Sequence, residues 1–234
     1  MNNNTVYEWI LHSTFTVAAR ESSLESAKPY LSSMVHRGDE VLDLCCGTGF
    51  VSFWLEEQGA KVTAVDFAPY MIALARKEAS HRHSTVEIVE ADMFAYDFGI
   101  DHFDLITCFD SISDFLISDF ARLNNKIACA LKPGGRFVVK YADILYKYIQ
   151  DNAAREGVYQ ELPERITYRI KGYLPEAGAV INTICNETRG EEYDRMGYIY
   201  TSPIVQLAMG NILNLEQHIS LDASQFLDVF VKTE

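Results

Sequence analysis

The sequence is short of cysteine, of basic residues and of long apolar runs. Its five cysteines among 234 residues are odd in number and form neither a zinc motif nor a disulfide framework, which favours a reducing cytoplasm. No apolar run reaches the roughly 18 to 20 residues that a membrane-spanning helix needs. The polar, uncharged start at Met1–Asn4 is unlike a secretory signal peptide. We therefore expect a cytoplasmic protein without a membrane partner.

Acidic residues outnumber basic ones by a wide margin. The 20 Lys and Arg against 33 Asp and Glu give a formal net charge of −13. Phosphate backbones and anionic lipid surfaces attract Lys and Arg, so this balance argues against nucleic acid as a partner. With 48% hydrophobic residues the chain can build a sizeable core. The composition leaves the oligomeric state open, a homodimer included.

Changes of pattern divide the chain into four parts. Residues 1–37 carry helix-like apolar spacing without strand alternation, so we expect an N-terminal helical lid. Residues 38–145 alternate short apolar strands with helical stretches and form the expected core. Residues 146–214 break that rhythm and predict an insertion that acts as a substrate lid. Residues 215–234 have the spacing of a β-hairpin that completes the core sheet.

The strands of the core are short and rich in Val, Ile and Phe, and several lack polar alternation, as strands buried on both faces do. They span Val41–Cys45, Lys61–Val65, Val86–Val89, Phe103–Phe109 and Arg136–Tyr141. Gly59, Pro69 and the turn at 132–135 separate them from helical stretches. The order predicts right-handed crossovers and an α/β fold, a Rossmann-like, mostly parallel seven-stranded sheet with helices on both faces.

After strand five the sequence predicts an antiparallel β insertion, because short alternating stretches there are separated by turn residues. Its strands are expected at Ile166–Leu174 and Val180–Glu187, with an extended run at Gly197–Thr201 and a helix at Pro203–Ile212. The terminal hairpin is expected at 215–221 and 226–232.

The most informative segment is the loop after the first strand. An apolar strand containing Asp43 runs into Cys45-Cys46-Gly47-Thr48-Gly49 and then into a helix. Glycine permits positive φ and lets a ligand approach the backbone, and a helix N-terminus offers unpaired N–H groups. This is the crevice where open α/β sheets bind nucleotide-like molecules.

Two further acids follow the second and third strands. Asp66 lies 17 positions after Gly49, where a carboxylate can accept both hydroxyl hydrogens of a ribose. Asp92 can meet an adenine amino group, with Met93 against the ring. The acids and the loop thus predict one nucleoside-like ligand.

This ordered set resembles the class I S-adenosylmethionine-dependent methyltransferases over about residues 38–141. The matching features are the Asp43–Gly49 loop, Asp66, Asp92, the strand Phe103–Ile106 and the segment Leu131–Gly135. The resemblance implies S-adenosylmethionine as the cofactor, with the Asp43 loop at its methionine moiety, Asp66 at the ribose and Asp92 at the adenine. The family often has glycine where Cys45 stands, so positive φ is less easy there.

The cofactor-binding residues expected from the resemblance come from the loops after strands one to four. They are Asp43, Cys45, Gly47, Gly49, Asp66, Phe67, Met71, Asp92, Met93, Cys108 and Phe109. A dinucleotide is the alternative ligand, since Gly47-x-Gly49-x-x-Ser52 approximates the G-x-G-x-x-G/A fingerprint. Ser52 at the third glycine position and the acid before the loop both favour S-adenosylmethionine.

The acceptor is expected over the ends of strands four and five. Residues 108–115 lack the Pro-Pro motif of enzymes that methylate nucleic-acid bases, and they resemble small-molecule methyltransferases that act on amines, amino acids or amino sugars. Asp110 and Asp114 can orient or deprotonate an acceptor, but helix capping, with Asp110 or Ser111 as N-cap, explains them equally well. Tyr141 is a third catalytic candidate.

Several other residues carry alternatives. Catechol-type O-methyltransferases hold Mg²⁺ with an Asp after strand four and an Asp-Asn pair after strand five; Asp110 and Asp143 match, but Ile144 replaces the Asn, so we predict no metal site. The remaining candidates are the bases His12 and His218, the lid residues Tyr7, Trp9 and Arg20, and the anion clamps Arg165, Arg169, Arg189 and Arg195.

The sequence thus predicts an enzyme that transfers a methyl group from S-adenosylmethionine to a small-molecule acceptor, with an amine nitrogen ahead of an oxygen. Methyl transfer from a sulfonium depends largely on positioning and desolvation, so no universal catalytic residue is required. The alternatives are a base-assisted or metal-assisted O-methyltransferase of a phenol or sugar, and a non-catalytic cofactor-binding interaction module.

Overall fold

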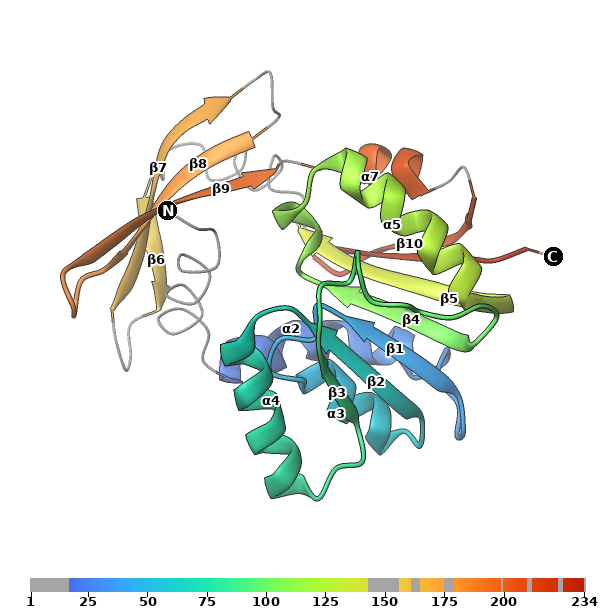
Figure 1. Ribbon diagram of the computed structural model, residues 1–234. Helices are drawn as coiled ribbons and strands as arrows, with labels where there is room; N and C mark the ends of the chain where they lie inside the picture. The colour runs from blue at the N-terminus through green and yellow to red at the C-terminus, as the bar shows by residue number, and fades with distance from the viewer. Residues whose placement is uncertain are drawn as a thin grey trace.

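The computed structural model describes residues 17–142, 156–160, 165–174, 179–198, 200–209, 212–222 and 225–233 (Figure 1). Within them the chain forms a seven-stranded sheet flanked by helices and a separate four-stranded sheet. The expected lid residues Tyr7 and Trp9, the candidate base His12, and Asp143 and Ile144 lie outside the described residues, and so does the side chain of Arg20.

The large sheet has the strand order β10-β11-β5-β4-β1-β2-β3. Its strands are β1 Glu40–Leu44, β2 Lys61–Asp66, β3 Glu87–Glu90, β4 Phe103–Phe109, β5 Leu131–Ala142, β10 Asn214–Ser220 and β11 Gln225–Val231. Neighbours from β3 through β5 pair in parallel, whereas β11 pairs antiparallel with both β5 and β10. The predicted mostly parallel sheet is confirmed, and the C-terminal hairpin adds its last two strands.

Helices cover both faces of this sheet. They are α2 Val17–Leu31, α3 Phe50–Glu57, α4 Pro69–Arg82, α5 Ile117–Ala130 and α7 Ser202–Met209. Buried side chains of α5 and α7 join one core cluster, and those of α2, α3 and α4 join the other (Figure 1). Parallel strands need this arrangement, because both of their faces are apolar and must be covered.

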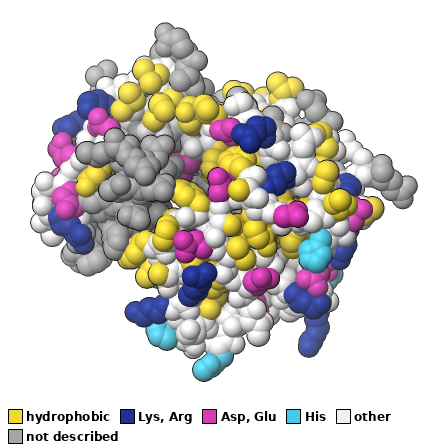
Figure 2. All heavy atoms as spheres, viewed as in Figure 1, with side chains coloured by type: hydrophobic (Ala, Val, Ile, Leu, Met, Phe, Trp, Pro, Cys, Tyr) yellow, Lys and Arg dark blue, Asp and Glu magenta, His cyan; other side chains and the backbone are white. Residues whose placement is uncertain are grey.

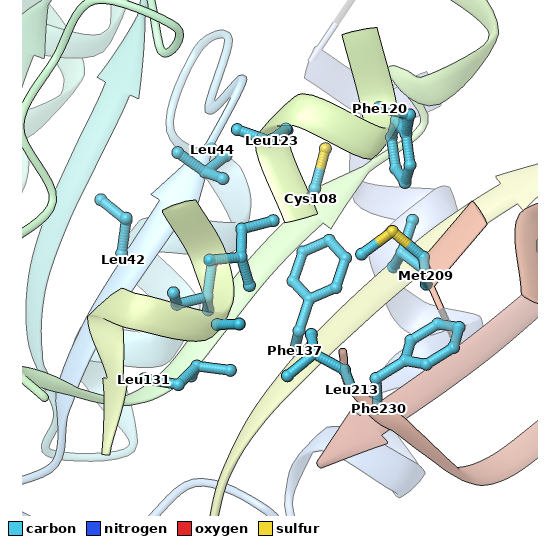
Figure 3. Close-up of a cluster of buried hydrophobic side chains, with 14 of the residues drawn as sticks. Leu42, Leu44, Cys108, Phe120, Leu123, Leu131, Phe137, Met209, Leu213 and Phe230 are labelled. Atoms are coloured by element: carbon cyan, nitrogen blue, oxygen red, sulfur yellow. The ribbon is translucent and has the colours of Figure 1, made fainter. Parts of the chain in front are cut away.

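The core under α5 and α7 is built from strand residues that point to the same face. Figure 3 shows Phe137 of β5 beside Phe230 of β11, with Met209 of α7 and Leu213 against them. The two phenylalanine rings are stacked with centroids 6.4 Å apart. All four side chains are fully buried, so the C-terminal hairpin is bound to the parallel strands by apolar contact as well as by backbone hydrogen bonds.

The second sheet is antiparallel and has the order β6-β7-β8-β9. Its strands are β6 Glu156–Gln160, β7 Ile166–Leu174, β8 Ala179–Asn186 and β9 Glu191–Tyr198. It stands to one side of the seven-stranded sheet, and β9 contacts the short 3-10 helix η1, Ile112–Asp114, that follows β4 (Figure 1). The predicted antiparallel insertion after strand five is therefore present.

The strands of the insertion differ in detail from those expected. The extended run predicted at Gly197–Thr201 overlaps only the last two residues of β9, which ends at Tyr198, and the sequence did not predict β6. Strand β9 carries several acidic side chains, so it lacks the apolar alternation by which a strand is predicted. These acids pair with basic side chains on β7: Asp194 lies 2.6 Å from Lys171 and Glu192 lies 4.0 Å from Arg169. One face of this sheet is thus a solvated ion-pair ladder, as an antiparallel sheet allows.

Charged side chains of both signs are interspersed with apolar ones on the face shown in Figure 2. Several basic side chains of the protein form ion pairs with acidic ones, for example Lys61 with Glu40 and Arg82 with Glu57.

We expect the substitution Phe137→Ala to lower the free energy of unfolding by about 3–5 kcal/mol, because it opens a cavity in a fully buried cluster. Urea denaturation of both proteins measures the difference. The control is Ile100→Ala, at a side chain that is 78% exposed, which should change stability by less than about 0.5 kcal/mol. Equal losses for the two variants would contradict the described core.

Candidate active site

The loop between β1 and α3 depends on left-handed backbone. Gly47 and Gly49 have φ of 56° and 83°. A Cβ on Gly49 would stand 2.8 Å from the ring of Phe53, so only glycine fits there. Cys45 also has a positive φ, 56°, although it is not glycine. The loop therefore holds the glycine-like conformation at the position where the sequence departs from the family.

Asp43 lies beneath this loop. Its side chain is 1% exposed, and its carboxylate accepts hydrogen bonds from the hydroxyls of Ser52 at 2.5 Å and Thr107 at 2.8 Å. Burial raises the pKa of Asp43 to about 6, against the lowering effect of these two bonds. Because both oxygens are bonded inside the protein, Asp43 supports the loop from below and does not present its oxygens to a ligand.

Asp66, at the end of β2, connects two loops. Its Oδ2 accepts the backbone N–H of Gly47 at 2.8 Å, and its Oδ1 accepts that of Ala68 at 2.9 Å. The residue is 9% exposed. A carboxylate oxygen is an acceptor and can take part in more than one hydrogen bond. The structure thus fixes this carboxylate at the entrance of the glycine loop.

The loop after β3 carries Asp92 and Met93. Asp92 is exposed and its Oδ1 accepts the N–H of Phe94 at 2.9 Å, whereas Met93 is 6% exposed and its sulfur lies 3.7 Å from Cys45 Sγ. Lys126 of α5 secures the loop, because its ammonium donates to the carbonyls of Met93, Phe94 and Tyr96 at 2.8, 3.0 and 2.6 Å. No sequence pattern indicates this role for Lys126, since its three acceptors are backbone atoms.

The other expected cofactor residues differ in exposure. Cys108 and Phe109 end β4 and are buried beside the glycine loop, and contact with Cys108 together with burial raises the pKa of the Cys45 thiol. Phe67, after β2, is 40% exposed and can meet a ligand directly. Met71 is 2% exposed within the first turn of α4, so it contributes to the core there.

Asp110 and Asp114 follow β4 but do not cap a helix. Ser111 stands at the N-cap position of η1 and makes no side-chain capping bond, since its hydroxyl donates to the carbonyl of Phe109. Asp110 has a left-handed φ of 57°, and its carboxylate accepts hydrogen bonds from Lys140 and Ser23. Asp114 is half-buried within η1. Asp110 is thus not the cap, whereas Ser111 occupies the expected N-cap position without a side-chain capping bond, and Asp114 lies in the first turn of η1 as the capping alternative expected.

Aromatic side chains join the insertion to this edge of the sheet. The rings of Phe94 and Phe115 meet edge to face with centroids 6.0 Å apart, and Tyr198 and Tyr200 stack at 6.2 Å. The hydroxyl of Tyr200 donates to the carbonyl of Phe115. Burial raises the pKa of Tyr200 to about 12, which keeps this phenol protonated. Half-buried aromatic surface therefore borders the loops after β3 and β4.

Residues 41–135 match the family model of a methyltransferase domain. The matched segment is thus a methyltransferase domain. Its fold is similar to the PH0226 protein of Pyrococcus horikoshii, with a TM-score of 0.75, 25% identity and coverage of 92% of this chain and 91% of the other. It also resembles an S-adenosylmethionine-dependent methyltransferase from Clostridium acetobutylicum, with a TM-score of 0.68, 18% identity and 88% of each chain covered.

Among curated relatives, a demethylmenaquinone methyltransferase from Thermus thermophilus is 39% identical over 101 residues, which are 42% of this chain and 45% of the relative. A ubiquinone biosynthesis O-methyltransferase from Xylella fastidiosa is 32% identical over 157 residues, which are 63% of this chain and 60% of the relative. The chain thus spans about half the length of the curated relatives it matches.

The structure places Tyr141 of this methyltransferase in the core. The side chain is 1% exposed, and its hydroxyl is hydrogen bonded to Ser202 and to Asp228, both at 2.8 Å. Asp228 also contacts His218 Nδ1 at 2.5 Å. A buried hydroxyl with two hydrogen-bond partners cannot reach a methyl acceptor, so we do not propose Tyr141 as a catalytic residue. His218 lies on β10, three strands from β4 and about 14 Å away at the usual strand spacing.

Two of the four arginines expected to bind an anion form ion pairs with acidic side chains of the insertion. Arg165 lies 2.9 Å from Glu187, and Arg169 pairs with Glu192 on the exposed ion-pair ladder of the insertion. The side chain of Arg195 lies outside the described residues.

Within the ranges that the structure describes, no group of three or more His, Cys, Asp or Glu side chains is arranged to hold a metal ion. No helix in that part of the methyltransferase has the length and apolar character needed to cross a bilayer.

We expect the stability of the methyltransferase to fall as pH rises through the range of Asp43. Its folded-state pKa of about 6 exceeds the ordinary value of 3.8, so the folded protein binds the proton more tightly. The protonated group therefore stabilises the fold below about pH 4, and up to about 3 kcal/mol is lost between pH 4 and 7. The substitution Asp43→Asn should remove this part of the slope.

Urea unfolding of wild type and Asp43→Asn across pH 4 to 7 measures the difference between their slopes. Because all other titrating groups are shared, the comparison isolates Asp43. Parallel pH profiles for the two proteins would show that Asp43 does not titrate in this range.

Proposed function

We propose that the protein transfers a methyl group from S-adenosylmethionine to a small-molecule acceptor at the carboxyl edge of its parallel sheet. The observation that carries the proposal is the Asp66 carboxylate, held at the glycine loop by the N–H of Gly47 inside a methyltransferase domain. A nucleoside ligand at such a crevice requires a fixed acceptor of this kind for its ribose hydroxyls.

The cofactor would lie across the loops after β1, β2 and β3. Gly47 and Gly49 leave the backbone open to the methionine moiety, Asp66 would accept the ribose hydroxyls, and Asp92 with Met93 would meet the adenine. When bound, S-adenosylmethionine supplies an electrophilic methyl group. The chain itself contributes orientation and exclusion of water, which the buried pair Cys108 and Phe109 supports.

The charges near the loop suit a sulfonium better than a dinucleotide. Asp43 lies beneath the glycine loop, where a carboxylate would repel the phosphates of a dinucleotide. The structure also explains Ser52 at the third position of the dinucleotide fingerprint, since its hydroxyl donates to Asp43. A glycine there would leave one oxygen of a buried carboxylate without its partner.

Two acceptor classes have support. Phe94, Phe115 and Tyr198 offer half-buried aromatic surface, and two curated relatives are named for demethylmenaquinone and ubiquinone biosynthesis. We therefore place a hydroxylated aromatic ring, methylated on carbon or oxygen, ahead of the amine that the sequence favoured. The exposed Asp92 and half-buried Asp114 keep an amine acceptor as the second candidate, because carboxylates attract its protonated form.

We expect S-adenosylhomocysteine to raise the melting temperature of the protein while NAD leaves it unchanged, since a ligand that binds the folded state stabilises it by mass action. Differential scanning fluorimetry measures both shifts. A shift with NAD alone would overturn the cofactor assignment.

The variant Asp66→Ala should lose most of the shift with S-adenosylhomocysteine, with affinity reduced about tenfold or more, because ribose hydroxyls lose a charged acceptor. The matched control is Asp97→Ala, at an exposed acid whose carboxylate accepts the N–H of Gly99. Wild-type affinity in Asp66→Ala would refute the ribose role.

We expect methyl transfer to a reduced naphthoquinol to exceed transfer to a primary polyamine when both are offered with radiolabelled S-adenosylmethionine. The physical reason is the aromatic surface, which stacks on a planar ring and gains little from a flexible amine. Faster transfer to the amine would reverse the order of the two acceptor classes. Binding of S-adenosylhomocysteine without transfer to either would favour the non-catalytic module.

A further inference from the structure

A buried lysine stands at the end of β5, beside the turn that follows β4. The Lys140 side chain is 1% exposed, and its ammonium donates to Asp110 Oδ1 and to Gln225 Oε1, both at 2.7 Å. The backbone repeats the contact, because the N–H of Asp110 donates to the carbonyl of Lys140 at 2.8 Å. The two residues are therefore joined through side chain and main chain together.

Asp110 needs such an anchor. Its φ of 57° is left-handed, which costs a residue with a Cβ free energy and is retained where neighbours fix it. Its second carboxylate oxygen accepts the hydroxyl of Ser23 from α2. Three segments thus meet at this residue, namely the ends of β4 and β5 and helix α2, and Lys140 links the start of β11 to the same point.

The charges around Asp110 distinguish between two possible roles of this residue, which are to orient the acceptor and to deprotonate it. A general base must accept a proton, and a protonated Asp110 would leave the buried ammonium of Lys140 without a counter-charge. A buried unpaired charge is strongly unfavourable. The carboxylate is 42% exposed, so it can still accept a hydrogen bond from outside while it stays ionised.

We infer that Lys140 is a positioning residue, which holds the ionised Asp110 in its left-handed turn and, through Ser23, docks helix α2 against the site. The inference rests on the proposed function. The turn directly follows Cys108 and Phe109, so loss of its anchor shifts residues that border the cofactor. Asp110 then orients ligands and is not the base of the reaction.

The test compares S-adenosylhomocysteine affinity, by isothermal titration calorimetry, in wild type, Lys140→Met, Asp110→Asn and the double variant. Lys140→Met should raise the Kd about tenfold, because it leaves Asp110 without its buried partner. Both substitutions break the same pair, so their effects should not add, and the double variant should bind about as weakly as Lys140→Met. The matched control is Lys61→Met, which breaks an exposed 2.7 Å pair with Glu40 at the opposite edge of the sheet and should leave the Kd unchanged.

A folded Lys140→Met variant with wild-type affinity, or a double variant in which the two losses of affinity add in full, would overturn the inference. If Lys140→Met does not fold, Ser23→Ala replaces it: we expect its Kd to rise about threefold and the amides of α2 to exchange faster, and unchanged values would overturn the inference. Failure of the wild type to bind S-adenosylhomocysteine would instead refute the proposed function.

Discussion

The carboxylate of Asp66 is the contact on which the site depends. It accepts the N–H groups of Gly47 and Ala68, and so it sets the distance between the glycine loop and the loop after β2. The parallel strand order brings the ends of β1, β2, β3 and β4 to one edge, and the helices on both faces follow from the same order. Without a fixed acceptor at that edge, these loops would carry no defined ligand geometry.

Two buried charges flank the end of β4, and each is compensated in its own way. Asp43 is held by the neutral hydroxyls of Ser52 and Thr107, which leaves its pKa raised to about 6. Lys140 is held by the ionised Asp110. A cationic cofactor above the loop would favour the charged form of Asp43. It would therefore counteract the effect of burial on the pKa of this carboxyl.

The fold and the cofactor loops were predictable from the sequence because they are local. Apolar strands, the glycines at 47 and 49 and the acids after successive strands occupy fixed places in a parallel sheet. Contacts between distant segments were not predictable. Tyr141 was a catalytic candidate at a strand end, but its hydroxyl is hydrogen bonded to Ser202 and Asp228, which lie more than 60 residues away in the sequence. Strand β9 was misplaced because its acids pair across strands, which periodicity does not record.

The central claim is that this edge binds S-adenosylmethionine through Asp66, and a crystal structure of the complex with S-adenosylhomocysteine tests it most directly. The account predicts both ribose hydroxyls within hydrogen-bond distance of the Asp66 carboxylate, with the ligand sulfur over the end of β4. A ligand bound elsewhere, or a ribose turned away from the Asp66 carboxylate, would contradict it.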